Sequence, residues 1–490
     1  MMQYPVVIQG GMGVAVSNWR LARAVAECGQ LGVVSGTALD QVLLRRLEDG
    51  DPGGHLRRAL DHFPFPAMAA RIRDAFFIPG GKAPNAPYSR AMGHTMEGPR
   101  AVQELCIVAN FVEVFLAKEG HSNPVGINYL EKIQRPHLPS MYGAMLAGVD
   151  YVLMGAGIPL KIPGALDALS RHEPATYPLV VKGADANDNF VSSFAPLDFI
   201  EGEPPPLTRP RFLAIIASNT LAATMLKRAS GKVDGFIVEG PVAGGHNAPP
   251  RGKLELDENG EPVYGERDIV DLPKLRELNV PFWLAGGYGS PEKIREALAA
   301  GAAGVQVGTP FAFCVETGLA EQYRLSVLAD AREGKAKIFT DPLASPTSFP
   351  FKVVPIDGSL SDGAVYEARP RICDLGYLQE AYKTAEGKVD FRCAGEPLTT
   401  FAAKGGDPAE SPGRKCLCNA LMANVGLAQS RNGHRVEQGL VTAGNDVAAL
   451  ARFLPEDGFD YTAADVLDIL LGPSSPDGEP LPAAALATHP

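Results

Sequence analysis

His246 follows a strand-like segment, in a setting where acid–base chemistry is expected. The run Phe236–Val238 is apolar and β-branched, as in a strand buried on both faces, and the sequence Ala243-Gly244-Gly245-His246 comes shortly after it. Active sites of α/β folds form beyond the carboxyl ends of such strands, and Gly245 would let another molecule approach the backbone closely. An isolated loop histidine would only make hydrogen bonds, but the regular series of strands around this one favours His246 as a catalytic residue.

Two further strand-like runs end in glycines. Gly286 and Gly287 follow the run that begins at Pro281, and Gly308 and Thr309 follow the run that begins at Ala303. If these are the last two strands of a barrel, their loops form its usual phosphate site, where backbone N–H groups bind a dianion. The alternative is that these glycines only permit tight turns.

Residues at the ends of two earlier strands could hold a ring system. Gly11 and Met12 follow the first strand, where a loop of small residues can lie flat against a planar ring. Asn128 ends the third strand, and its amide offers both a donor and an acceptor to a pyrimidine-like edge. For Met12, packing in the core is the simpler interpretation.

The elements that position these residues alternate regularly between strand-like and helical patterns. The eight strand-like runs are 6–9, 29–36, 124–130, 151–157, 212–218, 236–238, 281–287 and 303–308. Eight strands, each followed by a helical pattern, predict an α/β fold of the (β/α)8 TIM-barrel type. The alternative, an open doubly wound sheet, is disfavoured because no GxGxxG fingerprint follows the first strand.

Three segments fall outside this pattern. We expect a barrel over residues 1–354 that contains an inserted helical cap at 37–122, between strands two and three. A cysteine-bearing C-terminal appendage should cover residues 355–455, and the Pro/Ala/Gly-rich end, 472–490, is expected to be disordered. A long insertion within a compact domain is usually functional, so we expect the cap to lie near the site.

Four of the seven cysteines lie close together in the C-terminal region: Cys373, Cys393, Cys416 and Cys418. Four thiolates could bind zinc or an iron–sulfur cluster, and their sulfur atoms would then converge in space. The C-x-C spacing is a poor match to the common C-x₂-C element, and cysteine is often simply buried. Both interpretations stay open at this point.

The amino-acid composition of the chain disfavours some classes of binding partner. The net charge of −11 disfavours binding to nucleic acid or anionic membranes, and the hydrophobic content of 46% suits a soluble globular protein. The expected partner is a small-molecule substrate. No apolar run approaches the ~20 residues of a membrane span, and no secretory signal is visible. The odd number of cysteines favours a reducing, cytoplasmic location.

Five motifs carry a resemblance to a known family, over about residues 4–315. The chain resembles the nitronate monooxygenase family, formerly called 2-nitropropane dioxygenases, and its flavin enoyl-reductase relatives. The motifs are IQGGMG at 8–13, GINYL at 126–130, VEGPVAGGH at 238–246, LAGGYG at 284–289 and VQVGTPF at 305–311. The family usually has a proline before the methionine, whereas here Gly11 precedes Met12, and the segments at 37–122 and after 355 are extra.

The resemblance implies an FMN-dependent oxidoreductase. It implies that the FMN phosphate binds near Gly286, Gly287, Gly308 and Thr309, and that the ring lies near Met12 and Asn128. His246 would be the catalytic base or would orient the substrate, a nitronate or similar carbanion, with O2 as the redox partner. The alternative is an NAD(P)H-dependent enoyl reductase of lipid or polyketide synthesis, and the third possibility is a non-catalytic binding subunit.

Overall fold

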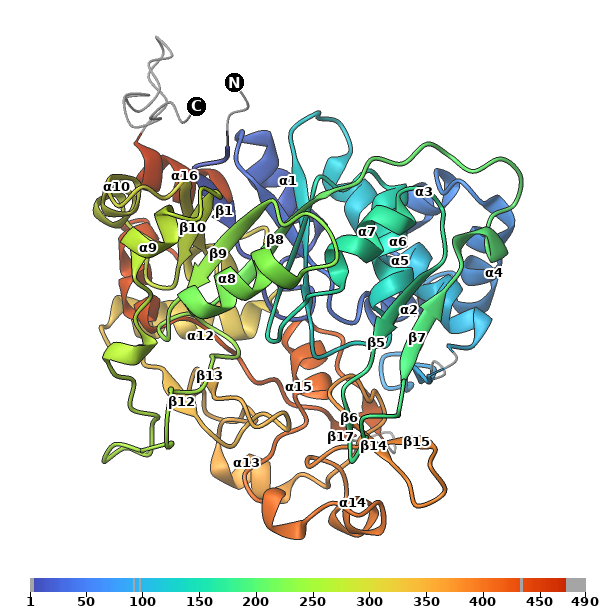
Figure 1. The fold of residues 1–490 in the computed structure, drawn as a ribbon. Helices are drawn as coiled ribbons and strands as arrows, with labels where there is room; N and C mark the ends of the chain where they lie inside the picture. The colour runs from blue at the N-terminus through green and yellow to red at the C-terminus, as the bar shows by residue number, and fades with distance from the viewer. Residues whose placement is uncertain (1–3, 91–92, 97, 432–434, 473–490) are drawn as a thin grey trace.

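The computed structural model describes residues 4–90, 93–96, 98–431 and 435–472. Its centre is a parallel sheet of eight strands, in the order β1-β11-β10-β9-β8-β4-β3-β2 (Figure 1). These strands are β1 (Val7–Gln9), β2 (Gly32–Ser35), β3 (Val125–Leu130), β4 (Tyr151–Gly155), β8 (Arg211–Ile216), β9 (Gly235–Glu239), β10 (Phe282–Ala285) and β11 (Gly304–Val307).

The sheet closes on itself between its first and last strands. Ile8 of β1 forms a parallel bridge with Leu31, next to β2. The Gln9 N–H donates to the Leu31 carbonyl at 2.9 Å, and the Leu31 N–H donates to the Val7 carbonyl at 3.2 Å. The predicted TIM-barrel fold is therefore confirmed.

The interior of the barrel is a core of its own. Alternate residues of the strands point inward, and the largest of them, Trp283, is fully buried. Its indole N–H donates to the Pro5 carbonyl at 2.8 Å, so the buried polar atom is satisfied. The other members of this cluster are Ile8, Leu31, Val33, Tyr151, Leu153, Leu213, Ile237 and Ala285.

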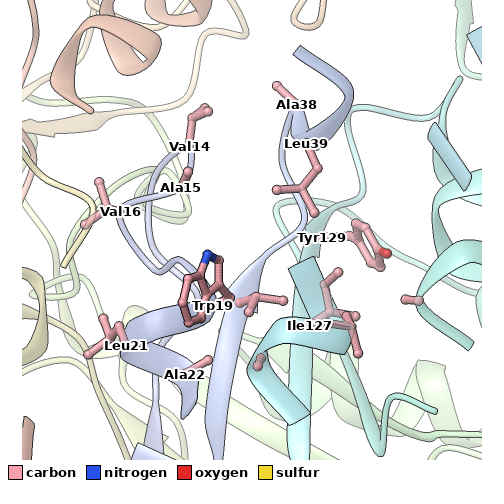
Figure 2. Close-up of a cluster of buried hydrophobic side chains, with 14 of the residues drawn as sticks. Val14, Ala15, Val16, Trp19, Leu21, Ala22, Ala38, Leu39, Ile127 and Tyr129 are labelled. Carbon is pink, nitrogen blue, oxygen red and sulfur yellow. The ribbon is translucent and has the colours of Figure 1, made fainter. Parts of the chain in front are cut away.

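Helices cover the outside of the barrel. The side chain of Asn18 caps the first one by accepting from the Leu21 N–H, and Ser290 caps α10 in the same way. Figure 2 shows the cluster in which the loop after β1 and helix α1 pack with β3. The helices are α1 (Trp19–Glu27), α5 (Arg100–Lys118), α6 (His137–Leu146), α7 (Ile162–Leu169), α8 (Asn219–Arg228), α9 (Leu272–Arg276), α10 (Pro291–Ala299), α11 (Thr309–Ala312) and α12 (Glu321–Arg332).

The segment between β2 and β3 is helical, as its pattern predicts. It forms α2 (Leu39–Glu48), α3 (His55–Asp61) and α4 (Pro66–Phe76) before it reaches α5. These helices pack against one another and against α5 at the side of the barrel (Figure 1). A shorter excursion follows α7 and contains the antiparallel pair β5 (Ala175–Pro178) and β7 (Val191–Phe194), the strand β6 (Val181–Lys182) and the turn η1 (Pro196–Asp198).

The chain after α12 covers one end of the barrel, at the bottom of Figure 1, and then returns to the barrel wall. Helix α16 packs on α1, α10 and α11, and β14 pairs with β6 of the excursion. The elements of this part are β12 (Phe339–Asp341), β13 (Phe351–Val353), α13 (Gly363–Ala368), β14 (Glu380–Lys383), β15 (Val389–Arg392), α14 (Leu398–Ala403), η3 (Pro408–Glu410), α15 (Leu417–Asn424), β16 (Ser430–Arg431), β17 (Arg435–Val436), η4 (Asn445–Phe453) and α16 (Ala463–Leu471).

Two segments lie outside these elements, the polar stretch after β9 and the tail. The polar stretch after β9 contains the turn η2 (Glu266–Asp268) and an antiparallel bridge between Leu256 and Pro262, so it is a short hairpin. The tail expected to be disordered lies, from residue 473 onward, outside the described residues. Within the described ranges, no helix is long and apolar enough to cross a membrane.

Candidate active site

A cavity of about 240 Å³ lies at the carboxyl ends of the barrel strands. One water molecule needs only about 10–15 Å³, so this space is large enough for an organic molecule. All nine residues that the sequence singled out line it, namely Gly11, Met12, Asn128, Gly245, His246, Gly286, Gly287, Gly308 and Thr309. The structure therefore brings together loops that follow five different strands.

His246 is held by a segment that lies about a hundred residues further along the chain. Its Nε2 atom is hydrogen-bonded to the Oγ atom of Ser345 at 2.7 Å, and its ring packs edge-on against Phe351 with 4.9 Å between centroids. The backbone is fixed as well, because the Lys352 N–H donates to the Gly245 carbonyl and the Gly245 N–H donates to Thr442 Oγ1, both at 2.9 Å. These contacts fix both the position and the ring plane of the imidazole.

The imidazole of His246 is neutral over the ordinary pH range. Burial lowers its pKa to about 3, and the positive charge of nearby Lys132 contributes to the decrease. Burial also lowers the pKa of Lys132, to about 7. The Lys132 ammonium lies 3.0 Å from the ring centroid of Phe349 and donates to the Thr347 carbonyl at 3.4 Å. A neutral base with a cation beside it suits a substrate that carries, or develops, negative charge.

Glu239 adds a second titratable group to the cavity. It is the last residue of β9, and burial raises its pKa to about 7. Among the described residues its carboxylate has no hydrogen-bond partner. Glu239 was not predicted as a site residue, although its place at a carboxyl end, seven residues before His246, is the same signal that identified the histidine.

Two buried acceptor atoms in the cavity wall have no partner in the described part of the chain. They are the Oδ1 atom of Asn128 and the Oε1 atom of Gln306. The amide of Asn128 is oriented, because its Nδ2 donates to the Gly11 carbonyl at 3.0 Å. Buried acceptors are normally satisfied, so these two oxygens suit a ligand with N–H donors.

The backbone is closely packed at the end of the cavity that contains Gly286, Gly287 and Thr309. Gly286 and Gly287 have φ angles of +86° and +75°, and a Cβ on Gly286 would lie 3.0 Å from the Ala243 nitrogen. Thr309 Oγ1 accepts from the Gly444 N–H at 2.9 Å, which joins this end to the C-terminal region. Asp446 also lines the cavity here, and burial raises the pKa of its carboxyl group. A raised pKa favours the neutral acid, which can donate a hydrogen bond to an anion.

The C-terminal region forms much of the cavity wall. It contributes Tyr377, Leu378, Cys418, Leu421, Thr442, Ala443, Gly444 and Asp446, and Phe351 lines the cavity from just before this region. Of the described residues in the inserted segment at 37–122, only Thr37 and Ala38 line the cavity. The region expected to be an appendage therefore covers the site, whereas the expected cap lies at the side of the barrel. The sequence contained no signal for this beyond the end of the strand–helix alternation after Phe311.

The four C-terminal cysteines are neighbours but do not form the tetrahedral cluster considered above. The thiols of Cys373 and Cys393 are hydrogen-bonded, Cys416 accepts from the Asn419 amide at 3.4 Å, and Cys418 faces the main cavity. In the described chain, no three potential ligand atoms from this set come within 4.8 Å of one another. The hypothesis of a four-cysteine metal centre is therefore wrong for this arrangement, because the four thiols serve three different contacts.

Comparison with known proteins agrees with the motifs. The family model "Nitronate monooxygenase" matches residues 208–340, which contain β8 to β11 and His246. A nitronate monooxygenase from Paraburkholderia phytofirmans is 28% identical over 184 residues, covering 36% of this chain and 47% of that protein. One from Pseudomonas aeruginosa is 30% identical over 152 residues, covering 31% of this chain and 40% of that protein. The matches thus span less than half of these curated relatives.

Two solved structures align with most of the chain at low sequence identity. The match to FabK from Thermotoga maritima has a TM-score of 0.48 at 16% identity, and it covers 96% of this chain and 92% of that protein. The match to nitroalkane oxidase from Streptomyces ansochromogenes has a TM-score of 0.44 at 15% identity, and it covers 95% of this chain and 94% of that protein. On the family match and the curated relatives, the chain resembles the nitronate monooxygenase family, as its five motifs predicted.

Proposed function

We propose that this protein is an FMN-dependent oxidoreductase that acts on a nitronate or a similar carbanion, with His246 as the base or the residue that orients the substrate. The observation that carries the proposal is the environment of His246. Its neutral imidazole is held by Ser345 at 2.7 Å, faces a cavity large enough for an organic molecule, and has the ammonium of Lys132 close by.

Residues at both ends of the cavity support FMN as the proposed cofactor. The unpartnered Oδ1 of Asn128 would accept from a ring N–H, and the small residues Gly11 and Gly245 leave room for a flat ring. Gly286, Gly287, Gly308 and Thr309 would hold the phosphate, with the neutral form of Asp446 as an additional donor. When bound, FMN supplies the electron-accepting chemistry, and the protein supplies binding, orientation and proton transfer.

His246 has a different task for each protonation state of the substrate. A neutral nitroalkane must first lose the proton beside its nitro group, and Nε2 of His246 could accept it if Ser345 releases its hydrogen bond or shifts with it. A nitronate has already lost that proton, so there the histidine would only orient the substrate. Lys132 would favour binding of the anion in both cases.

This difference gives a direct experiment. The rates of flavin reduction would be measured for a neutral nitroalkane and for its preformed nitronate, with the wild type and with His246→Gln. If His246 is the base, the variant should lose about 10²–10⁴-fold with the nitroalkane but keep most of its rate with the nitronate. His62→Gln is the matched control, since His62 is exposed and its Nδ1 bonds only to the Arg58 carbonyl within its own helix.

Other outcomes are equally informative. Equal losses with both substrates would assign His246 to substrate orientation. Unchanged rates with both substrates would contradict any catalytic role. A protein that does not retain added FMN would contradict the proposal as a whole.

A second candidate function is an NAD(P)H-dependent enoyl reductase. It is favoured by a second cavity of about 370 Å³ that shares Tyr377 and Leu378 with the first and is lined by Lys132, Lys182 and Arg392. A long anionic cofactor or thioester could occupy both spaces. Anaerobic mixing with propionate 3-nitronate or with NADPH separates the two functions, because only the true reductant bleaches the flavin. A flavin bleached by neither compound would favour a binding subunit.

A further inference from the structure

Three side chains with metal-binding atoms meet beside the cavity wall, outside the site described above. They are Asp40 in α2, His94 in the connection between α4 and α5, and Cys106 in α5. Their carboxylate, imidazole and thiol ligand atoms all lie within 4.8 Å of one another, which no other group of three such residues in the described chain achieves. Asp40 and Cys106 are buried, and the His94 side chain is only 9% exposed.

The carboxylate of Asp40 is strongly held. His94 Nε2 lies 3.0 Å from Asp40 Oδ2, and the Tyr377 hydroxyl donates to Asp40 Oδ1 at 2.5 Å. The orientation of Asp40 is therefore fixed by a residue of the cavity wall, as is usual for carboxylates that bind metals.

The thiol of Cys106 is hydrogen-bonded to Ser140. On binding a divalent cation, the thiol would release one proton, and the thiolate and the Asp40 carboxylate together would balance the two positive charges. The buried site would then be electrically neutral, which is the least costly arrangement in a medium of low dielectric constant.

The donor set suits zinc. Zinc binds oxygen, nitrogen and sulfur at about 2.0–2.3 Å in tetrahedral geometry, which places neighbouring ligand atoms about 3.3–3.7 Å apart. The present separations, all within 4.8 Å, would need to change by up to about 1.5 Å to meet this. A fourth ligand such as water would complete the tetrahedron.

We propose that Asp40, His94 and Cys106 bind one Zn²⁺ ion. The ion would join α2, α5 and the connection between α4 and α5, and through the Tyr377–Asp40 hydrogen bond it would fix this side of the cavity wall. The proposal does not depend on the reaction that the barrel catalyses. Without a metal, the same residues would be a hydrogen-bonded Asp–His–Tyr group with an unrelated cysteine beside it.

The experiment measures metal binding by the full-length protein. Apo protein would be loaded with Zn²⁺ and dialysed, and its zinc content measured by elemental analysis. In parallel, Co²⁺ would be added to detect the near-ultraviolet band of a cobalt–thiolate bond. We expect one zinc per chain, release of one thiol proton per ion, and a cobalt band that reports a single cysteine ligand.

Variants assign the ligands. Cys106→Ser and His94→Asn should lose zinc, and Cys106→Ser should also lose the cobalt–thiolate band. Cys28→Ser is the matched control, since Cys28 is exposed at the end of α1. The double variant Cys373→Ser/Cys418→Ser tests whether other cysteines bind the metal. Both control variants should retain zinc and the cobalt–thiolate band.

Failure of the proposal would be equally clear. A wild-type protein that retains no zinc and shows no cobalt–thiolate band overturns it. Zinc that persists in both Cys106→Ser and His94→Asn also overturns it. If Cys106→Ser does not fold, the wild-type cobalt band and the metal content of His94→Asn, which changes a partly exposed residue, decide the matter.

Discussion

The imidazole of His246 and the hydroxyl of Ser345, 2.7 Å apart, join the end of a barrel strand to the region that covers the barrel. Ser345 is itself fixed from two sides. Its Oγ atom is hydrogen-bonded to Thr347 Oγ1 at 2.8 Å, and its carbonyl accepts from the Arg414 guanidinium at 2.7 Å. The position of the proposed catalytic histidine therefore depends on residues far from it in sequence.

Ser345→Ala should lower the rate with a neutral nitroalkane while the FMN content stays normal. Loss of one hydrogen bond to the imidazole corresponds to about 1 kcal/mol, or roughly fivefold, and a poorly positioned base adds to this. The measurement is kcat for the nitroalkane and for the nitronate, with Ser170→Ala as a control outside the site. An equal effect of both serine substitutions would contradict the positioning role.

Arg414 acts on the same loop, which makes a coupling experiment possible. Its guanidinium donates to the carbonyls of Leu343 and Ser345 and to Ser348 Oγ, at 2.7–3.0 Å. Arg414→Met should therefore lower kcat in the same direction, and combined with Ser345→Ala it should cost less than the sum of the two single effects. Strict additivity would mean that Arg414 does not act through Ser345.

Lys132 should make the binding of anionic substrates depend on pH near neutrality. Burial lowers its pKa to about 7, so its positive charge is lost as the pH rises through that value. KM for a nitronate should therefore rise several-fold between about pH 6 and pH 8, the range in which Lys132 titrates. In Lys132→Met, KM for the nitronate should be high at both pH values, and it should depend less on pH than in the wild type. Lys182→Met is the control, because Lys182 lines the second cavity and is half exposed.

Glu239 should destabilise the protein above neutral pH. Its pKa is raised from 4.5 to about 7, so the folded state favours the protonated form, and stability is lost as the pH rises from about 4.5 through about 7. The loss is at most about 3 kcal/mol, at 1.36 kcal/mol per pH unit. Thermal unfolding of cofactor-free Glu239→Gln should match the wild type near pH 4.5 and exceed it at about pH 8. A constant difference in Tm at all pH values would contradict this.

Gly308→Glu should abolish FMN binding. A Cβ at this position would lie 3.4 Å from the Met12 sulfur, and the carboxylate would place negative charge where we propose the phosphate. The flavin absorbance of the purified protein measures the outcome, with Gly363→Glu as the control because a Cβ there has no heavy atom within 4 Å. Normal FMN content in a folded Gly308→Glu variant would place the phosphate elsewhere.

The barrel half of the site could be predicted from the sequence because each part of it is local. Gly286 and Gly308 directly follow buried strands, His246 comes seven residues after one, and the closed barrel brings the carboxyl ends of those strands together. Asn128 was found in the same way, in the carboxyl-terminal half of β3. In each case the period of the apolar residues determines the strand, and the strand determines where the side chain lies.

The other half of the site could not be predicted, because its contacts are distant in sequence. Ser345 lies 99 residues from His246, and Thr442 lies 197 residues from Gly245, with which it forms a hydrogen bond. The stretch that contains Ser345 has no strand or helix period long enough to indicate a partner. The cysteines show the opposite error, since closeness in sequence suggested a common metal site, whereas in the described chain no three of their sulfur atoms come within 4.8 Å of one another.

Helix α16 has a consequence for the order in which the protein can fold during synthesis. Its buried residues Val466, Leu467 and Leu470 cover α1, whose residues are made more than four hundred positions earlier. All eight barrel strands have been synthesised by Val307, yet at that moment α1 still lacks this neighbour. A nascent chain released early would therefore present an apolar surface to chaperones and proteases, and the barrel reaches its native outer layer only when α16 has been made.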